Sequence, residues 1–387
     1  MATCSVICRT EEISAYFIKR FKTFALVKVV SPNTLDESPA CEYYVDGTLS
    51  RAFSIPSLHR LPASSGHLLF INHLVYILSI IYSVVRLGEK FDLFIGVGPY
   101  YNLAGLLLKS VGFVKHVLYY AGDYFPLAED VSVMLNFKLK LFHFLDSLSV
   151  RYSDGVWSSL ELVRVAHSNC GVFPPKGSVD FVAPLGLKKH RDVFVTTRYG
   201  HELVYFGSVQ RGKGIELLIE VMPELIRKVP DVLVNIVGTG SMEDEFRGLV
   251  KNLGFERYFN FFGYIPNGQR LDEILGRSSL GLALFDPRDG EFSQYVNPGK
   301  VMEYISRGIP PVISKNIQIA SDISEMRGGY CIDYSPASLC SVIISAFTNE
   351  GELSEIKHNL EAVANKYEWE SILSGVYDII CKRFGKI

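Results

Sequence analysis

One stretch decides the fold of the C-terminal half of this chain: Asn297-Pro298-Gly299-Lys300-Val301-Met302-Glu303-Tyr304. Asn297 is a good helix N-cap, and Pro298 suits the first helical position, where a missing N–H costs nothing. Gly308 is placed to end the helix, as a glycine after the last turn commonly does. Residues 309–314 are apolar and suit a buried strand. The pattern therefore predicts a short helix followed directly by a strand.

The start of this helix is a candidate phosphate site. Its free backbone N–H groups point at any ligand placed there, and Lys300 lies in the first turn. On a helical wheel Lys300, Glu303 and Arg307 share the polar face, so Glu303 could accept hydrogen bonds from a ribose. The alternative is a surface ion pair between Glu303 and Arg307, four residues apart, worth about 0.2–0.5 kcal/mol. Spacing alone favours the surface pair.

Length and composition set the broad class. The 387 residues suit two domains. The net charge of −2 shows no excess of basic residues, which argues against nucleic acid as the main partner. The seven cysteines are scattered without a CxxC pair, which favours a reducing compartment and argues against structural zinc. The first nine residues lack the charged and apolar regions of a signal peptide.

An uncharged run of 18 residues, Leu68 to Val85, interrupts this globular pattern. Its length is near the lower limit for a membrane-spanning helix. Asn72, His73 and two serines break its apolar character. We expect a helix that is buried in the first domain or touches a membrane, and a true span is the less favoured alternative.

Both halves alternate apolar strands with amphipathic helices, which is typical of parallel α/β sheets. Residues 41–55, with Asp46-Gly47 at the centre, predict a two-residue hairpin. The polar residues 188–192 and the stretch up to Gly200 predict a linker. The strands expected in the first half are residues 24–30, 91–97, 117–120, 155–158 and 181–184. Those expected in the second half are residues 203–206, 232–237, 260–263, 281–285, 311–314 and 329–332.

Four motifs in order resemble the donor domain of glycosyltransferase family 4, also called glycosyltransferase group 1. They are the strand at 203–208 with the Lys213-Gly214 helix start, the strand at 234–241, the strand at 261–266, and the PxKxxEY stretch with the GIPPVI that follows it. Trp369-Glu370 is similar to the start of the last helix in that family. The resemblance covers about 170 residues of the C-terminal half, and in its light Glu303 is expected to bind ligand.

The resemblance implies the GT-B fold: two Rossmann-like parallel-sheet domains that face a cleft. The expected domains are an acceptor-binding domain at 1–190, a nucleotide-sugar-binding domain at 200–368, and a terminal helix at 369–387 that crosses back to the first. The implied activity moves a sugar from a nucleotide-diphosphate donor to a glycan or lipid-linked acceptor, with retention of configuration. The expected location is the cytoplasm, with peripheral contact at the inner face of the membrane left open.

The family's motifs also assign residues to the donor site. Lys213 would neutralise the diphosphate leaving group, and its flanking glycines would let the backbone approach a ligand. The family usually has an arginine where this chain has Ser208, and Arg211 is the candidate substitute. Many members have a second glutamate where this chain has Tyr295. The expected donor-binding residues are Ser208, Arg211, Lys213, Gly240, Asn297, Gly299, Lys300 and Glu303.

Asp123 is the candidate catalytic residue. It follows a strand of the first half, where the family often has a His-Asp pair, and its carboxylate could position an acceptor hydroxyl or the donor. Gly122 occupies the place of the histidine, and an N-cap role for Asp123 is the alternative. No metal-binding spacing of histidines is found, so no metal and no cofactor are expected. Two rival interpretations stay open: a nucleotide-sugar 2-epimerase and a non-catalytic scaffold subunit of the same fold.

Overall fold

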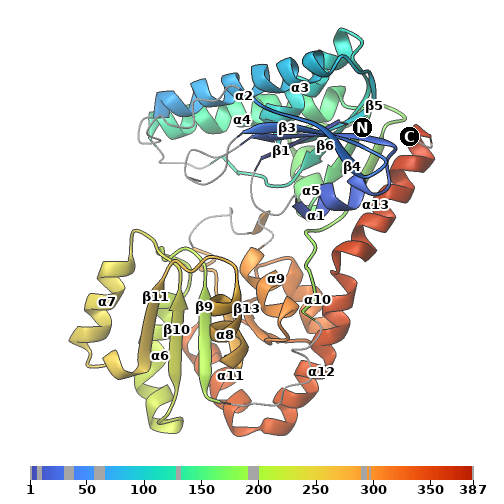
Figure 1. Cartoon of the computed structure of the whole chain (residues 1–387). Coiled ribbons are helices and arrows are strands. Elements are labelled where there is room, and N and C mark those ends of the chain that lie inside the picture. Colours follow the sequence, from blue (N-terminus) through green and yellow to red (C-terminus); the bar gives the residue numbers. More distant parts are fainter. Residues whose placement is uncertain are drawn as a thin grey trace. The chain divides into compact units, whose positions relative to one another are not determined.

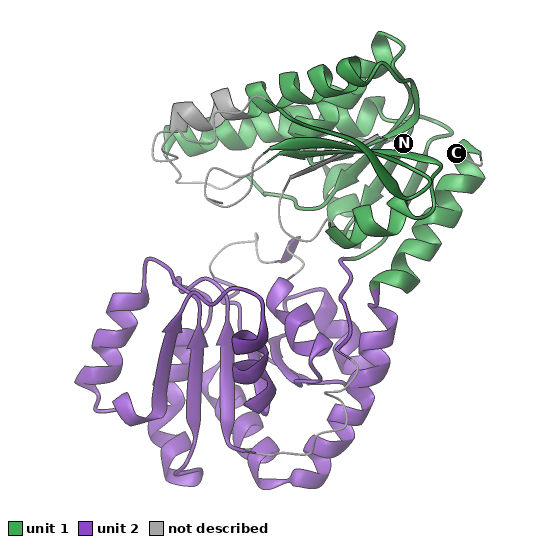
Figure 2. Cartoon of the chain, in the orientation of Figure 1, with its two compact units in different colours: residues 1–184, 369–387 green, residues 185–368 purple. Residues whose placement is uncertain are grey.

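The structure is a computed structural model that divides into two compact units (Figure 2). The first unit contains residues 1–184 and 369–387, and the second contains residues 185–368. The division falls before the polar stretch expected as a linker. The structure describes residues 2–6, 11–29, 39–55, 66–127, 132–190, 200–288, 294–295 and 298–385, without the side chains of 2–6 and 66–72.

The first unit is built on a mixed sheet with the order β4-β3-β2-β1-β5-β6-β7-β8. The β2–β3 and β3–β4 pairs are antiparallel and the other pairs are parallel. Its strands are β1 (Ala2–Val6), β2 (Thr23–Val29), β3 (Ala40–Val45), β4 (Thr48–Ser54), β5 (Phe91–Val97), β6 (Val114–Ala121), β7 (Gly155–Ser158) and β8 (Val179–Val182). The expected strands are confirmed within a few residues, and β1 is an additional strand.

The expected hairpin is confirmed in β3 and β4. Asp46 and Gly47 both have positive φ, 47° and 78°, as a two-residue turn between twisted antiparallel strands requires. Figure 1 shows α2 (Gly66–Leu87), α3 (Pro99–Ser110) and α4 (Val133–Tyr152) along one side of this sheet. The other helices of the unit are α1 (Glu11–Ile18), α5 (Glu161–Asn169) and α13 (Trp369–Phe384).

The uncharged run from Leu68 to Val85 lies within α2, and the expectation of a helix in the first domain is confirmed. Tyr76, Ile80 and Val84 are buried in the core that α2 forms with β2, β5 and α3. Their spacing of four residues places them on one side of the helix. Among the residues that the structure describes, no helix is long and apolar enough to cross a membrane.

The C-terminal helix α13 belongs to the first unit. Glu370 at its start forms an ion pair with Arg20 at 2.6 Å, and the Tyr377 ring lies 5.5 Å from the ring of Phe21. These contacts attach α13 beside α1. The chain enters α13 from α12 (Glu350–Lys366) through a two-residue break.

The second unit is an all-parallel sheet with the order β11-β10-β9-β12-β13-β14. Its strands are β9 (Glu202–Phe206), β10 (Leu233–Val237), β11 (Phe259–Gly263), β12 (Leu280–Ala283), β13 (Pro311–Ser314) and β14 (Tyr330–Ile332). Its other helices are α6 (Ile215–Lys228), α7 (Glu243–Asn252), η2 (Glu256–Tyr258), α8 (Gln269–Arg277), α9 (Gly299–Ser306), α10 (Ile319–Glu325) and α11 (Pro336–Thr348). This order is that of a doubly wound dinucleotide-binding sheet.

Candidate functional site

The strand order of the second unit reverses between β9 and β12, which are neighbours in the sheet. Ligands of such sheets bind outside the carboxyl ends of the strands at this reversal. The chain after β9 runs through Gly207 and Ser208, and the chain after β12 runs through Leu284 and Phe285. The fold therefore places a candidate site at these two strand ends.

Tyr304 joins the two strands beneath the site. Its hydroxyl accepts a hydrogen bond from the Phe206 backbone N–H at 2.8 Å and lies 3.1 Å from the carbonyl oxygen of Leu282, to which it can donate. Gly281 makes room for the phenol ring, because a Cβ at that position would lie 2.5 Å from the ring carbons of Tyr304. A glycine within a strand is a sequence signal of such a close contact, and the sequence interpretation did not use it.

The helix α9 brings Lys300 to this edge. It begins at Gly299 after Pro298, so the expected helix is confirmed with a start one residue later. Asn297, expected as N-cap and donor-binding residue, lies outside the described residues. Gly308 has a φ of 67° and donates to the Ile305 carbonyl, which confirms its role as the terminating glycine.

Lys300 is packed against aromatic rings. Its Nζ lies 3.9 Å from the ring centre of Tyr205 and 5.5 Å from that of Phe285. Gly207 leaves space for this side chain, since a Cβ there would lie 3.3 Å from Lys300 Cε. Part of Lys300 reaches solvent, yet the surrounding protein atoms, and then Lys213, lower its pKa to about 7. Burial of this cation is costly, and an anionic ligand would offset the cost.

Lys213 approaches the same place from the loop after β9. Its Nζ lies 5.6 Å from the ring centre of Phe285, so both ammonium groups lie within 6 Å of the centre of the same aromatic ring. Gly214, which precedes α6, has a φ of 90° and packs against Leu284, where a Cβ would lie 2.2 Å from the leucine Cβ. Ser208 is exposed at the end of the strand, and its carbonyl accepts a hydrogen bond from Tyr205.

Glu303 lies one turn further along α9 and is half-buried. Its carboxylate accepts a hydrogen bond from Arg307, which also binds Asp272 of α8 at 2.7 Å. The expected alternative of a surface pair is wrong in one respect, because the Arg307 side chain is only 6 % exposed. The polar face of α9 is covered by α8 and by His190. The backbone N–H of His190 donates a hydrogen bond to the Ser306 carbonyl.

Gly240 supports the site through the backbone. The loops after β9 and β10 touch so closely that a Cβ on Gly238 would lie 1.8 Å from the Gly207 oxygen. A Cβ on Gly240 would lie 2.0 Å from the Val209 oxygen. The Val209 N–H also donates to the Thr239 carbonyl at 2.9 Å. The two glycines therefore serve the packing of the loops beside the two lysines.

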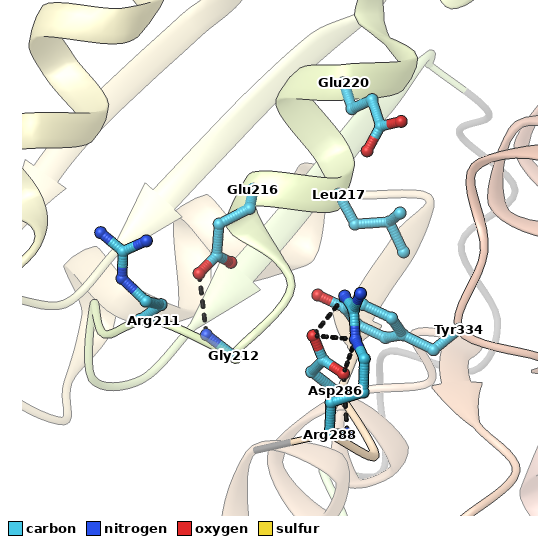
Figure 3. A pocket seen from close by; sticks show the side chains of 8 residues that line it. All are labelled: Arg211, Gly212, Glu216, Leu217, Glu220, Asp286, Arg288 and Tyr334. Carbon is cyan, nitrogen blue, oxygen red and sulfur yellow. Dashed lines mark hydrogen bonds and ion pairs between the residues drawn. The ribbon is translucent and has the colours of Figure 1, made fainter.

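Arg211 is directed to a different place. It is 70 % exposed and pairs with Glu245 of α7 at 3.0 Å. It borders a cavity of 310 Å³, in which three residues of α6 face residues that follow β12 and β14 (Figure 3). The lining residues are Arg211, Gly212, Glu216, Leu217, Glu220, Asp286, Arg288 and Tyr334. The ion pair thus directs the Arg211 side chain to α7.

Polar groups that line this cavity bind one another. Glu216 accepts a hydrogen bond from the Gly212 N–H at 2.8 Å, and Asp286 pairs with Arg288 at 2.7 Å. Arg288 is the main reason that the pKa of Asp286 lies below its ordinary value. One oxygen of Glu216 is buried and has no hydrogen-bond partner among the described residues.

Asp123 lies in the first unit, two residues beyond the end of β6. More than a third of its surface is exposed, yet nearby protein atoms raise the pKa of its carboxyl above the ordinary value. Residues 122–127 form no helix, so the expected N-cap alternative has nothing to cap in that stretch. Behind it, Asp146 binds the Tyr119 hydroxyl at 2.5 Å and His167 at 2.8 Å.

The sequence interpretation missed three residues of the site: Tyr205, Phe285 and the anchoring Tyr304. The two rings lie at the carboxyl ends of expected strands, which was the available signal. Among the residues that the structure describes, no three histidine, cysteine or acidic side chains gather in a way that could hold a metal ion.

Comparisons with known proteins concern the family and the fold. Residues 198–366 match the family model described as glycosyl transferases group 1. Sucrose-phosphate synthase from Thermosynechococcus elongatus is 13 % identical with a TM-score of 0.73, over 100 % of both chains. WaaG, a glycosyltransferase involved in lipopolysaccharide biosynthesis, is 14 % identical with a TM-score of 0.68, over 98 % of this chain and 99 % of WaaG. No curated protein sequence matches the chain.

HepE from Anabaena, solved in complex with UDP and glucose, is 13 % identical with a TM-score of 0.66. That match covers 99 % of this chain and 100 % of HepE. These likenesses show the fold, and they confirm the predicted GT-B class with two α/β units. The predicted family is confirmed for residues 198–366, which form a group 1 glycosyltransferase domain, and this domain together with the fold supports the predicted glycosyltransferase activity.

Proposed function

We propose that this glycosyltransferase moves a sugar from a nucleoside diphosphate to a hydroxyl group of a glycan or lipid-linked acceptor. The reaction retains the anomeric configuration and needs no metal ion. It belongs to polysaccharide or glycolipid biosynthesis in the cytoplasm, with peripheral contact at the inner face of the membrane. Retention rests on the resemblance to the family, and the cytoplasm on the scattered, unpaired pattern of the cysteines.

The observation that carries the proposal is the pair of lysines at the switch point of the second unit. The ammonium groups of Lys213 and Lys300 both lie near the Phe285 ring, and Lys300 lies at the start of α9. A diphosphate bound between them would accept hydrogen bonds from both cations and from the free N–H groups of α9. Its negative charge would return the Lys300 pKa towards the ordinary value of a lysine.

The same groups would act in the transfer step. The bond between the anomeric carbon and the phosphate oxygen breaks, and the electron pair leaves with the nucleoside diphosphate. The two lysines and the helix start stabilise this developing charge, which a metal ion would otherwise carry. A bond then forms between the anomeric carbon and the acceptor oxygen, whose proton passes to the departing diphosphate or to water. We assign Asp123 to the positioning of the reacting groups, and Glu303 to the ribose hydroxyls.

The donor is tested by calorimetric titration with UDP-, GDP- and ADP-sugars. HepE has been solved with UDP-glucose, which makes a uridine nucleotide the first candidate. Lys300→Met and Lys213→Met should each weaken binding by roughly 10- to 100-fold, the loss of one charge-assisted hydrogen bond. Lys366→Met, which removes an exposed lysine paired with Asp322, is the matched control. Unchanged affinity in both site variants would overturn the donor site.

A turnover assay tests the remaining features. Release of nucleoside diphosphate should depend on an acceptor and continue in excess EDTA. The anomeric configuration of the product, measured by proton NMR, should equal that of the donor. Inversion, or an epimerised nucleotide-sugar without transfer, would contradict the proposed reaction.

A further inference from the structure

The helices α2, α3 and α4 leave an apolar surface uncovered. On α2, Leu74, Leu78, Tyr82 and Val85 are each between 45 % and 56 % exposed. Their spacing of four, four and three residues places them in one stripe along the helix, opposite the buried stripe. Exposed apolar side chains gathered in this way mark a surface that binds a partner. Figure 1 shows that α2 lies along the same side of the first sheet as α3 and α4.

A second stripe runs along α4 and mixes aromatic with basic residues. Val133, Phe137, Lys140, Phe144 and Arg151 follow one another at spacings of three, four or seven residues, and all are exposed. Phe137 is 59 % exposed and Phe144 is 61 % exposed. A lysine between two uncovered phenylalanines does not suit a protein core. It suits the boundary between lipid headgroups and acyl chains, where apolar rings insert and cations stay in water.

Basic residues outnumber acidic ones in this helical layer, and one of the basic residues, Lys109, is paired with Asp154 at 2.6 Å. The described helices α2, α3 and α4 carry five basic residues, Arg86, Lys109, Lys138, Lys140 and Arg151. Their one acidic residue, Asp146, is 3 % exposed and is bound by Tyr119 and His167. The whole chain, in contrast, has more acidic than basic residues, 41 against 39. Glu129 and Asp130, which precede α4, lie outside the described residues.

We propose that the outer surface of α2 and α4, which we call the α2–α4 surface, binds a bilayer that contains anionic lipids. The aromatic and aliphatic stripes enter the headgroup region, and the basic side chains contact the lipid phosphates. This inference gives a location to the membrane contact that is part of the proposed function, and it rests on that function for its role. The attachment would bring the first unit to a lipid-linked acceptor.

The surface is tested by sedimentation of the full chain with vesicles. Vesicles of phosphatidylcholine with roughly one-third phosphatidylglycerol should bind the protein, and vesicles of phosphatidylcholine alone should bind it at least tenfold more weakly. The difference should shrink as salt is raised, because screening weakens the attraction of lysine to phosphate. Equal binding to both vesicles, or binding to neither, would overturn the proposal.

Two pairs of variants locate the contact. Phe137→Ser with Phe144→Ser should reduce binding at least tenfold, and so should Lys138→Glu with Lys140→Glu. Matched controls change exposed residues of the second unit: Leu249→Ser with Leu253→Ser, and Lys228→Glu with Lys251→Glu. Both control proteins should bind like the wild type. A loss of binding in the controls but not in the α2–α4 variants would place the contact elsewhere.

Two further measurements distinguish membrane binding from self-association, and the surface from the donor site. A concentration-dependent dimer that the Phe137 and Phe144 changes abolish, without vesicle binding, would assign the surface to a second copy of the chain. Nucleotide affinity should be unchanged in all α2–α4 variants, because the lysines of the donor site lie in the other unit. Vesicle binding without nucleotide binding would overturn the proposed function and leave the surface assignment intact.

Discussion

The ammonium group of Lys300 lies 3.9 Å from the centre of the Tyr205 ring. This cation–π contact holds the lysine against the end of β9 before any ligand arrives. The aromatic face compensates only part of the lost hydration, and burial still lowers the Lys300 pKa to about 7. The side chain is thus positioned for an anion and is incompletely charged without one.

Nucleotide-sugar affinity should therefore depend on pH through Lys300. The diphosphate binds the protonated lysine, so binding is strongest below pH 7 and weakens as the pH rises above the pKa of the free protein. We expect a decrease of about tenfold between pH 7 and pH 8.5. Titration calorimetry with a nucleotide-sugar, whose diphosphate does not titrate in this range, measures it. Lys300→Met should remove the dependence, and a retained slope would assign it to another group.

Lys300 should also reduce the stability of the free protein. Its folded pKa is lower than the ordinary value of 10.5. The unfolded chain therefore binds more protons between pH 7 and pH 10.5, and stability should rise with pH across that window. Lys300→Met should raise the free energy of unfolding at pH 7 by roughly 1–3 kcal/mol. Chemical denaturation checks this, and a less stable variant would contradict the cost of burial.

Comparison with Asp272 distinguishes the proposed ligand-binding role of Glu303 from its role in an ion pair. Both carboxylates bind Arg307, but only Glu303 lies on α9 beside the lysines. Glu303→Ala should weaken nucleotide binding by about 10- to 150-fold, the loss of charge-assisted hydrogen bonds to the ribose. Asp272→Ala should leave the affinity nearly unchanged. Similar effects of the two changes on affinity would remove Glu303 from the site.

Arg307→Ala serves as the stability control for that pair. The arginine is buried between two carboxylates, and its loss leaves both without their partner. We expect a loss of about 3 kcal/mol in the free energy of unfolding, because breaking a buried pair on one side is strongly destabilising. The change is followed by urea denaturation. A loss below about 0.5 kcal/mol would restore the interpretation of a surface pair.

Gly281 should not tolerate a methyl group. Gly281→Ala would press against the Tyr304 ring, because the added Cβ would lie 2.5 Å from the ring carbons. The expected cost is about 1–3 kcal/mol of stability, from overpacking beside a fully buried side chain. Gly276→Ala on the exposed side of α8 is the matched control, since nothing lies within 4 Å of its added Cβ. That control should gain roughly 0.5–1 kcal/mol from helix propensity. Thermal unfolding of both variants decides the comparison.

Asp123→Asn should lower the rate of transfer and not the affinity for the donor. A positioned carboxylate contributes about 100-fold or more to such steps. The asparagine keeps the size of the side chain, so folding should be unaffected. Asp92→Asn, at an exposed site on β5 of the same unit, is the control. Turnover with acceptor is the readout, and an unchanged turnover number would exclude Asp123 from the reaction.

Local patterns were sufficient for much of the fold. Strands β5, β7 and β13 have the predicted bounds, because short apolar runs bounded by glycine and polar residues mark them. Strand β1 was missed because Ala2–Val6 is short and has polar residues at its centre. Its pairing with β2 and β5 depends on residues far along the chain, which no local pattern records.

The candidate site was predictable in its motif and not in its contacts. Lys300 and Glu303 were recognised from spacing and resemblance. The burial of Arg307 depends on Asp272, 35 residues earlier, and on His190. The helical wheel of α9 alone placed Arg307 in solvent. Similarly, Arg211 stands near Lys213 in the sequence, but its side chain pairs with Glu245 of α7.

The contact of Gly238 and Gly240 with the loop after β9 also limits how this enzyme can change its donor. Any side chain at either glycine would force apart two backbones that lie against each other. Ser208 follows Gly207, and Thr239 lies between Gly238 and Gly240. Both side chains are exposed, so they can be substituted without moving the loops. A change of nucleotide preference, by evolution or by engineering, should therefore keep Gly238 and Gly240 and substitute Ser208 or Thr239.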